Sequence, residues 1–353
     1  MQGESVGAAM TEGQLEQLPE AVDDGGVESE PVRVALLGTG SIAQVVHLPI
    51  LSGLPGVILQ GVADIDLPRA RVIADRLGVP KLYETDEDAI ESDDIDAVVI
   101  CTPSYLHEEL AISAMRAGKD VLVEKPIAFT AEGAERVCQV AEETGRCLMV
   151  AMNYRYRPDI QAIRPFVAGG ELGEIFLVKA GWLNRKIRLP RPTWRHRLET
   201  AGGGALMDLG TQVIDLLLWT LGYPKVEAVD ARLHPGEGIE VEETAALILS
   251  LEGGATASVE VSWNLHAERD RHQLQILGRE GSASISPLTV YKEAEHGLLD
   301  LTPQLAPGRE NLYTAAYRQL LTDFIARTRS EEPVAPPREQ IELMRVIEWG
   351  YNQ

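Results

Sequence analysis

Residues 32–43 read Val-Arg-Val-Ala-Leu-Leu-Gly-Thr-Gly-Ser-Ile-Ala. The apolar run 32–37 is typical of a buried strand, and a helical stretch, 41–51, follows the second glycine directly. In this GxGxxA pattern the first glycine permits a tight turn, the second lets the backbone approach a ligand, and the helix N-terminus offers unpaired N–H groups. A strand, glycine turn and helix in this order indicate a pyrophosphate cradle. The residues predicted to bind a dinucleotide here are Gly38, Gly40, Ser41 and Ile42.

An acidic residue closes the next strand. The apolar run 57–63 ends in Asp64, which lies 24 residues beyond Gly40. A carboxylate at this place accepts hydrogen bonds from the ribose hydroxyls of NAD and repels a 2′-phosphate. The sequence therefore predicts NAD as cofactor, while Arg69 and Arg71 leave NADP as an alternative.

The rest of the chain divides into two patterns. As far as residue 151, apolar strands (97–100, 121–123, 147–151) alternate with helical stretches (67–77, 105–117, 131–144), which indicates a parallel sheet covered on both faces. From residue 152 onward, closely spaced strands with period-2 character indicate antiparallel hairpins. We expect a nucleotide-binding α/β domain at 31–151 and an α+β domain with an antiparallel sheet at 152–353.

Composition excludes several classes of function. The chain has 353 residues and a net charge of −22, which argues against nucleic acid or an anionic membrane surface as the main partner. No apolar run reaches the ~18–20 residues of a membrane span. The three cysteines form no CxxC pair, which fits a reducing cytoplasm and gives no metal site. Residues 1–30 carry eight acidic and no basic side chains, so we expect a disordered tail.

Polar residues follow the strands at the edge where doubly wound folds bind ligands. Glu124-Lys125-Pro126 comes directly after the strand 121–123, so Lys125 is expected beside the cofactor, where it polarises an oxygen and exchanges a proton. A cis bond before Pro126 would fix the direction of this lysine. The alternative is a solvated charge pair. Residues expected to wall the cofactor after the strand 97–100 are Thr102 and Pro103, with His107 either near the cofactor or structural.

The glycine-rich segment 202–215 carries the clearest polar stripe. Asp208 and Gln212 are spaced i,i+4 and Asp215 is three further on, so an α-helix would place all three on one face. Buried polar groups need partners. We expect Asp208 and Gln212 to face a polar substrate, against the alternative of bonding to the glycine loop, and we assign Asp215 to structure.

Taken together, the motifs resemble the glucose–fructose oxidoreductase / inositol dehydrogenase / rhizopine-catabolism (Gfo/Idh/MocA) family. The resemblance runs from about residue 32 to at least 281. Its carriers are residues 38–43, 46–49, 62–64, 101–107, 123–126, 153–158, 202–215 and 277–282. It implies an N-terminal Rossmann domain with a doubly wound parallel sheet and a C-terminal α+β domain with a largely antiparallel sheet. The activity it implies is NAD(P)-dependent oxidation or reduction of sugars, inositols and polyols. It also implies that the protein is a homodimer or homotetramer.

The resemblance also implies site residues. Lys125 matches the family's catalytic lysine, and Asp208 matches the acid that holds substrate. Gln212 stands where the family usually has a histidine, and glutamine cannot take up a proton. Either Lys125 accepts the proton while Asp208 and Gln212 orient the substrate, or another group replaces the histidine, or the protein binds cofactor without turnover. The replacement candidates are Tyr154, Tyr156 and His196.

Substrate recognition is expected from the second domain. Indole rings that could stack on sugar faces are Trp182, Trp194 and Trp263. Groups that could bind hydroxyls, a carboxylate or a phosphate are Arg155, Asn184, Arg185, Lys186, Arg188 and Arg195. This basic density suggests an anionic sugar acid or a subunit contact. A redox-neutral, NAD-assisted glycoside hydrolase or epimerase is a further alternative.

Overall fold

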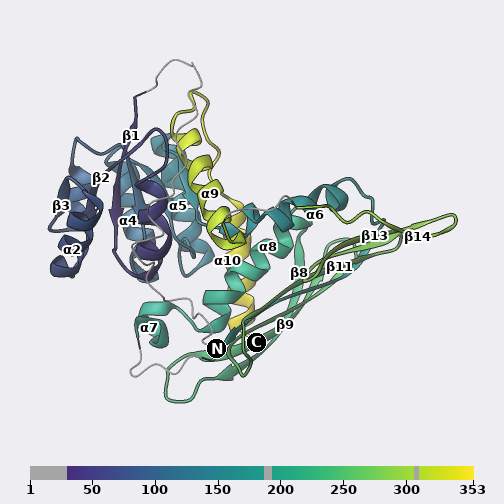
Figure 1. Ribbon diagram of the computed structural model, residues 1–353. Helices are drawn as coiled ribbons and strands as arrows, with labels where there is room; N and C mark the ends of the chain where they lie inside the picture. The colour runs from purple at the N-terminus through teal and green to yellow at the C-terminus, as the bar shows by residue number, and fades with distance from the viewer. Residues whose placement is uncertain (1–29, 187–192, 306–309) are drawn as a thin grey trace. The chain divides into compact units, whose positions relative to one another are not determined.

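The computed structural model describes residues 30–186, 193–305 and 310–353 (Figure 1). The expected acidic tail, apart from Glu30, and Arg188 lie outside the described residues. The chain forms two compact units, each described by itself below. Of the described residues, unit 1 comprises 30–124, 136–151 and 317–337, and unit 2 comprises 125–135, 152–186, 193–305, 310–316 and 338–353. The chain thus passes between the units several times, whereas we predicted a single boundary at 151/152.

Unit 1 is built on a six-stranded parallel sheet. Its strands are β1 (Val32–Leu37), β2 (Val57–Ala63), β3 (Lys81–Tyr83), β4 (Ala97–Ile100), β5 (Asp120–Val123) and β6 (Leu148–Val150). The strand order is β3-β2-β1-β4-β5-β6, so the direction of winding reverses between β1 and β4. The carboxyl ends of strands beside such a switch point form the ligand edge of a doubly wound fold. The parallel sheet expected from the sequence is confirmed.

Helices lie along this sheet. They are η2 (Ala43–His47, π-helical), α1 (Leu48–Leu51), α2 (Leu67–Leu77), α3 (Asp86–Glu91), η3 (Ser104–Leu106), α4 (His107–Arg116), α5 (Ala131–Thr144) and α9 (Leu312–Thr328), with α5 and α9 each continuing into unit 2. Asp66 caps the start of α2 by accepting from the backbone N–H of Arg69, and Gly78 ends that helix in the left-handed conformation. Local signals of this kind explain why the predicted and observed bounds of α2 agree.

Unit 2 contains an eight-stranded sheet. Its strands are β7 (Ile175–Arg185), β8 (Val226–Pro235), β9 (Glu242–Leu251), β10 (Thr256–Leu265), β11 (Arg271–Gly278), β12 (Gly281–Ile285), β13 (Leu288–Ala294) and β14 (Gly297–Asp300). The order is β14-β13-β12-β11-β7-β10-β9-β8. β7 and β10 run parallel, and the other neighbouring strands pair antiparallel. The largely antiparallel sheet is therefore confirmed.

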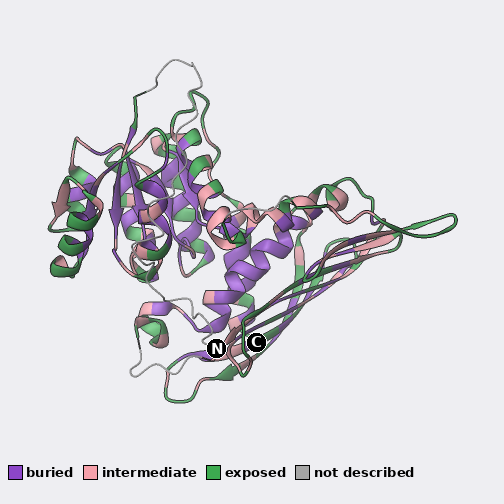
Figure 2. Ribbon diagram, in the orientation of Figure 1, coloured by how far each residue is buried: buried purple, intermediate pink, exposed green. Residues whose placement is uncertain are grey.

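The helical layer of unit 2 contains η4 (Asn153–Tyr156), α6 (Pro158–Ala168), η5 (Trp194–His196), α7 (Leu198–Ala201), η6 (Leu206–Gly210), α8 (Thr211–Thr220) and α10 (Glu339–Tyr351). Figure 2 shows α8 buried along nearly its whole length. The single helix expected at 205–221 instead begins with the π-helical turn η6. The prediction that Asp208, Gln212 and Asp215 share one face assumed α-helical spacing, and the i→i+5 hydrogen bonds of a π-helical turn alter that spacing. Within the described ranges, no helix is both long and apolar enough to cross a membrane.

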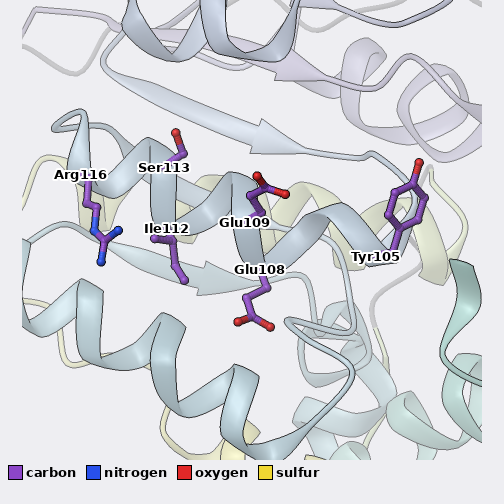
Figure 3. A pocket seen from close by; sticks show the side chains of 6 residues that line it. All are labelled: Tyr105, Glu108, Glu109, Ile112, Ser113 and Arg116. Carbon is purple, nitrogen blue, oxygen red and sulfur yellow. The ribbon is translucent and has the colours of Figure 1, made fainter. Parts of the chain in front are cut away.

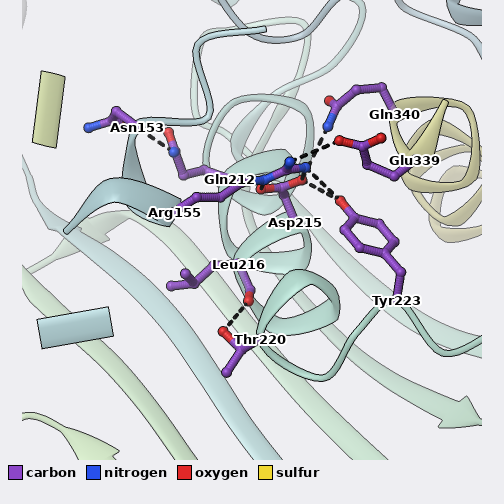
Figure 4. A network of polar contacts seen from close by, with 9 residues as sticks. All are labelled: Asn153, Arg155, Gln212, Asp215, Leu216, Thr220, Tyr223, Glu339 and Gln340. Carbon is purple, nitrogen blue, oxygen red and sulfur yellow. Dashed lines mark hydrogen bonds and ion pairs between the residues drawn. The ribbon is translucent and has the colours of Figure 1, made fainter. Parts of the chain in front are cut away.

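A buried ion-pair network holds α8 in unit 2 (Figure 4). Arg155 of η4 donates from Nε to Asp215 Oδ2 (2.8 Å) and from Nη2 to Asp215 Oδ1 (2.5 Å). Its Nη1 donates to Oε1 of Glu339 in α10 (2.9 Å). Tyr223 and Gln340 also donate to Asp215. The side chain of Asp215 is 1% exposed, so these ion pairs and hydrogen bonds offset the free-energy cost of removing its carboxylate from water.

Removing this carboxylate should destabilise unit 2. We expect Asp215→Ala to lower the free energy of unfolding by about 3–5 kcal/mol, because the Arg155 guanidinium would remain buried without its main partner. Urea denaturation followed by circular dichroism measures the change. Asp230→Ala, on an exposed position of β8, is the control and should cost little. Equal losses in the two variants would contradict the role of the network.

Candidate active site

The glycine turn after β1 has the geometry of a phosphate cradle. Gly38 has a φ of +87°, and a Cβ there would lie 2.8 Å from the backbone of Cys101 and Thr102. At Gly40, by contrast, a Cβ would meet nothing within 4 Å, so space is open beside the start of the helix. Ser41 and Ile42 are helical and directly follow this glycine. The turn therefore fits a dinucleotide, as the sequence predicted for these positions.

Asp64 lies directly after β2 and beside the same turn. Its Oδ2 accepts from the backbone N–H (2.6 Å) and the hydroxyl (2.8 Å) of Thr39. Its Oδ1 accepts from the N–H of Asp66 (2.8 Å) and from Nη2 of Arg69 (2.6 Å). Burial would raise the pKa of Asp64, but the hydrogen bonds from Arg69, Asp66 and Thr39 together lower it. The carboxylate is therefore ionised at neutral pH.

Two further segments at the same edge were predicted to wall the cofactor. Thr102 and Pro103 join β4 to η3, and the Thr102 hydroxyl is buried without a hydrogen-bond partner. A bound ligand would supply that missing partner. His107 begins α4, is 1% exposed, and its Nε2 lies 3.0 Å from the Thr102 carbonyl oxygen. It braces the loop that carries these residues.

Glu124, at the end of β5, belongs to a buried cluster of unit 1. Its Oε1 accepts from the Tyr317 hydroxyl (3.1 Å) and lies 2.7 Å from Nε2 of His47. His47 also meets the Tyr317 ring edge-on, with 5.2 Å between centroids. Tyr317 could not be predicted as a partner of Glu124, because it comes from α9, almost two hundred residues further along the chain. These contacts fix the carboxylate that immediately precedes Lys125.

In unit 2, Lys125 and Asp208 form a close ion pair. Lys125 Nζ donates to Oδ1 of Asp208 (2.6 Å) and to its backbone carbonyl (2.8 Å). Trp263 Nε1 donates to the second carboxylate oxygen (3.2 Å). Burial would raise the pKa of Asp208, but the neighbouring Lys125 and Arg195 charges lower it. The Lys125–Pro126 peptide is cis, as predicted. Ammonium and carboxylate are thus held together by the structure.

The position of Asp208 is set from its N-terminal side. The Glu242 carboxylate of β9 accepts from the backbone N–H groups of Gly204 (3.0 and 3.1 Å) and Leu206 (2.9 Å), where the helical run begins. An anion at a helix N-terminus is electrostatically favourable. A Cβ at Gly204 would lie 2.0 Å from the Glu242 carbonyl oxygen, so glycine is required for this approach. Sequence reasoning did not identify Glu242.

Gln212 forms a buried amide pair. Its Nε2 donates to Oδ1 of Asn153 (2.9 Å), and the two residues are 2% and 1% exposed. The second amide atom of Asn153, Nδ2, is buried and has no partner. Asn153 received no role from the sequence although it begins one of the motifs. The pair offers hydrogen bonds without any group that changes charge.

Aromatic side chains line the neighbouring end of the sheet. Trp182 of β7 stacks on Tyr154, with 4.9 Å between centroids and 20° between planes. The Tyr154 hydroxyl lies 3.1 Å from Nδ1 of His272 in β11. Burial raises the pKa of Tyr154, and burial together with Arg157 lowers the pKa of His272 to about 4. Tyr154 therefore keeps its proton at neutral pH, which argues against it as a substitute base.

The other predicted substrate residues differ in their surroundings. Arg195 is exposed and lies over the ring of Trp194, with 4.3 Å to the centroid. His196 Nδ1 accepts from the backbone of Thr193 (2.9 Å). Arg155, predicted to bind substrate, is instead engaged by Asp215 and Glu339, because a buried guanidinium needs internal partners. These two carboxylates hold the guanidinium within unit 2. The predicted residues at the end of β7 are Asn184, Arg185 and Lys186, and Oδ1 of Asn184 is buried without a partner.

Unit 1 has a hollow on its surface. It is lined by Tyr105, Glu108, Glu109, Ile112, Ser113 and Arg116 (Figure 3). All six come from η3 and α4, and none is a predicted site residue. Among the residues that the structure describes, no group of three or more His, Cys, Asp or Glu side chains could hold a metal ion. Neither feature changes the candidate site.

The glycine turn, Asp64 and the doubly wound sheet are the features of a dinucleotide-binding unit. Family comparison agrees. Residues 32–152 match the oxidoreductase family with an NAD-binding Rossmann fold, and residues 160–284 match the GFO/IDH/MocA C-terminal domain. The chain belongs to this family and is an NAD-binding oxidoreductase.

Individual relatives cover most of the chain. D-glucoside 3-dehydrogenase of Escherichia coli (strain K12) is 28% identical over 291 residues, 77% of this chain and 82% of the relative. The uncharacterised oxidoreductase ORF334 of Rhizobium meliloti is 32% identical over 256 residues, 72% and 74% of the two chains. The crystal structure of GenD2 from gentamicin A biosynthesis, in complex with NAD, superposes with a TM-score of 0.80 at 26% identity, covering 94% and 96%.

The low pKa of His272 should appear in the pH dependence of stability. Between pH 6.5 and about 4 the unfolded chain binds a proton that the folded chain does not, so stability falls on acidification. We expect His272→Asn to reduce the loss between pH 7 and pH 4 by at most about 3 kcal/mol. Urea titrations at several pH values measure this slope. His234→Asn, at an exposed position of β8, is the control, and an unchanged slope in His272→Asn would contradict the assignment.

Proposed function

We propose that this protein is an NAD-dependent dehydrogenase of sugars, inositols, sugar acids or related polyols, with Lys125 as the proton acceptor. The observation that carries the proposal is the Lys125–Asp208 pair, with 2.6 Å between Nζ and Oδ1. The E. coli relative supports the substrate class, since its name describes oxidation of a glucoside. Asp208 and Gln212 orient the substrate in this proposal.

NAD held at the glycine turn supplies the hydride acceptor. On the protein side, the Lys125 ammonium first gives its own proton to solvent. The amine then accepts the proton of the substrate hydroxyl as the hydroxyl-bearing carbon loses hydride, and the alcohol becomes a carbonyl. The resulting ammonium is stabilised by the adjacent Asp208 carboxylate, which Trp263 holds in orientation. In the reverse direction, the same ammonium donates a proton to the carbonyl oxygen of the reduced product.

The amide pair and the aromatic residues supply recognition. Gln212 and Asn153 present hydrogen-bonding groups of fixed orientation, and the unpartnered Nδ2 of Asn153 is suited to donate to a hydroxyl. The indole of Trp182 has a buried Nε1 without a partner, which is suited to donate to a substrate hydroxyl. Exposed Arg195 beside Asp208 favours a substrate that carries a carboxylate.

A second candidate is a protein that binds cofactor without turnover. Gln212 favours it, because the amide cannot replace a general base. NADH formation with a panel of polyols, inositols and sugar acids separates the two candidates. Absence of turnover in both the wild type and Gln212→His would favour the second candidate.

We also propose that the protein works in the cytoplasm as a homodimer or homotetramer. The cysteines Cys101, Cys138 and Cys147 are all buried thiols outside any disulfide, which suits a reducing compartment. Phe176 and Ile248 are exposed apolar side chains of the unit 2 sheet, which suits a subunit contact. Analytical ultracentrifugation tests the assembly, and a monomer at micromolar concentration would contradict it.

Replacing the lysine should remove turnover and leave the cofactor bound. We expect Lys125→Ala to lower kcat by about 10²–10⁴-fold, the usual contribution of a positioned acid–base group. NADH formation and NAD titration by intrinsic fluorescence measure the two effects. Lys179→Ala, at an exposed position of β7, is the matched control. An unchanged kcat in Lys125→Ala would contradict the role of Lys125 as proton acceptor.

Replacing Gln212 by an ionisable residue should change the dependence of kcat on pH. Lysine side chains ordinarily titrate at alkaline pH, whereas histidine titrates near neutrality. We therefore expect Gln212→His to move the rising limb of kcat for alcohol oxidation toward neutral pH. Gln212→Asn, which adds no base, should leave the limb in place. A limb that shifts equally in both variants would speak against a proton-accepting role at this position.

A further inference from the structure

Side chains from two other elements cap the first turn of η6. The start of a helix leaves backbone N–H groups without partners inside the helix, and the residue before η6 supplies no side-chain cap. Instead, Glu242 of β9 accepts from the N–H groups of Gly204 (3.0 and 3.1 Å) and Leu206 (2.9 Å). The Tyr351 hydroxyl of α10 accepts from the N–H of Met207 (3.1 Å). The turn is therefore held from β9 and from α10.

The two capping side chains also bind each other. The Tyr351 hydroxyl donates to Oε1 of Glu242 (2.9 Å), and Glu242 is 8% exposed. Burial and the adjacent carboxylate raise the pKa of Tyr351, so the hydroxyl keeps its proton. A hydrogen bond to an ionised group is stronger than one between neutral groups. The Glu242 carboxylate therefore fixes the direction of the hydroxyl, whose oxygen stays turned toward the Met207 N–H.

Two further glycines permit this close packing of α10 on the turn. A Cβ at Gly203 would overlap the Tyr351 hydroxyl. A Cβ at Gly350, the residue before Tyr351, would lie 3.0 Å from Cδ2 of Leu206, which is tighter than an ordinary van der Waals contact. Because neither residue has a side chain, α10 comes close enough for its tyrosine hydroxyl to reach the backbone of η6.

Asp208 directly follows the capped residues. Its N–H donates to the carbonyl oxygen of Gly204 (2.9 Å), which belongs to the same capped segment. Lys125 Nζ binds both Oδ1 (2.6 Å) and the backbone carbonyl oxygen (2.8 Å) of Asp208. A carboxylate can rotate about its side-chain bonds, whereas a backbone carbonyl lies in a planar peptide and moves only with its turn. The bond from Lys125 to this carbonyl therefore depends on where the cap holds the turn.

We propose that Tyr351 and Glu242 are positioning residues for Lys125, which they hold in place through the backbone of Asp208. Both act without exchanging a proton themselves. The consequence for turnover rests on the proposed dehydrogenase activity, in which the held amine takes up the substrate proton. The hold on Lys125 does not depend on that activity, so the two can be tested separately.

Chemical labelling of lysines tests the hold on Lys125 without any turnover. Acetic anhydride acylates an amine only while its nitrogen is free to attack, so a bound amine is labelled slowly. We expect Tyr351→Phe to raise the labelling rate of Lys125 several-fold, because the Met207 N–H loses its acceptor and the Asp208 carbonyl is no longer fixed. Peptide mass spectrometry gives the rates, with exposed Lys179 of β7 as the reference within the same protein.

Kinetics test the consequence for turnover. Tyr351→Phe should lower kcat for alcohol oxidation about tenfold, the usual effect of one hydrogen bond, and leave the dissociation constant of NAD unchanged. In a Lys125→Ala background the same substitution should lower kcat no further, because the group that it positions is absent. A residue that only stabilises the fold would lower kcat by the same factor in both backgrounds, and that result would overturn the proposal.

A matched tyrosine variant separates positioning from the loss of any hydroxyl. Tyr83→Phe, in β3 of unit 1, removes a hydroxyl that donates to Oγ of Ser92 (3.0 Å). It should change neither the labelling of Lys125 nor kcat. An increase in Lys125 labelling that is equal in Tyr83→Phe and Tyr351→Phe would contradict the proposal.

A conservative change of the carboxylate gives a second, independent variant. Glu242→Gln keeps one oxygen acceptor but turns an NH₂ group toward the N–H of Gly204, so it should also raise the labelling of Lys125. Labelling of Lys125 that stays unchanged relative to Lys179 in both Glu242→Gln and Tyr351→Phe would overturn the proposal. If labelling rises as expected while no alcohol is oxidised, the positioning role is supported and the dehydrogenase activity is contradicted.

Discussion

A single buried charge, the Asp215 carboxylate, constrains the helical layer of unit 2. A carboxylate that is 1% exposed must be paired, because desolvating it costs several kcal/mol. Its donors come from η4, from the residues after α8 and from α10, so these segments keep fixed positions around α8 (Figure 4). Gln212 lies one turn from Asp215, and Asn153 lies two residues from Arg155. The same ion pair therefore holds the amide pair of the candidate site.

The boundary between the two units falls between two neighbouring charged residues of the chain. Glu124 ends a buried cluster of unit 1, with His47 and Tyr317, while Lys125 begins unit 2 and pairs with Asp208. In each unit the charged group is oriented by partners that have little freedom, because they are buried or lie on the sheet. This arrangement agrees with a reaction in which the protein supplies orientation and electrostatics and the cofactor supplies the redox chemistry.

Strands and helices with a strong local sequence pattern could be predicted, and those with a weak pattern could not. β1, β2, β4 and α2 have the predicted bounds, because an uninterrupted apolar run or a capped amphipathic helix is visible in the residues themselves. β3 and α3 were missed, since three half-buried residues and a short acidic helix carry no such period. The π-helical turn η6 was read as α-helix, because the same apolar residues suit both. Arg155 is predicted from the sequence to bind substrate, because its carboxylate partner Asp215 lies sixty residues further along the chain and the sequence does not show that the two residues meet.

The glycine turn, the cofactor class and the candidate residues Lys125, Asp208 and Gln212 could be predicted from the sequence, because glycine turns and short motifs act through adjacent residues. The partners of these residues became known from the fold alone. It joined Asp208 to Lys125 and Trp263, gave Gln212 its partner Asn153, and placed Arg69 on Asp64. The physical reason is that a buried polar group takes its partners from whatever the fold brings within about 3 Å, and that distance in space has no counterpart in distance along the chain.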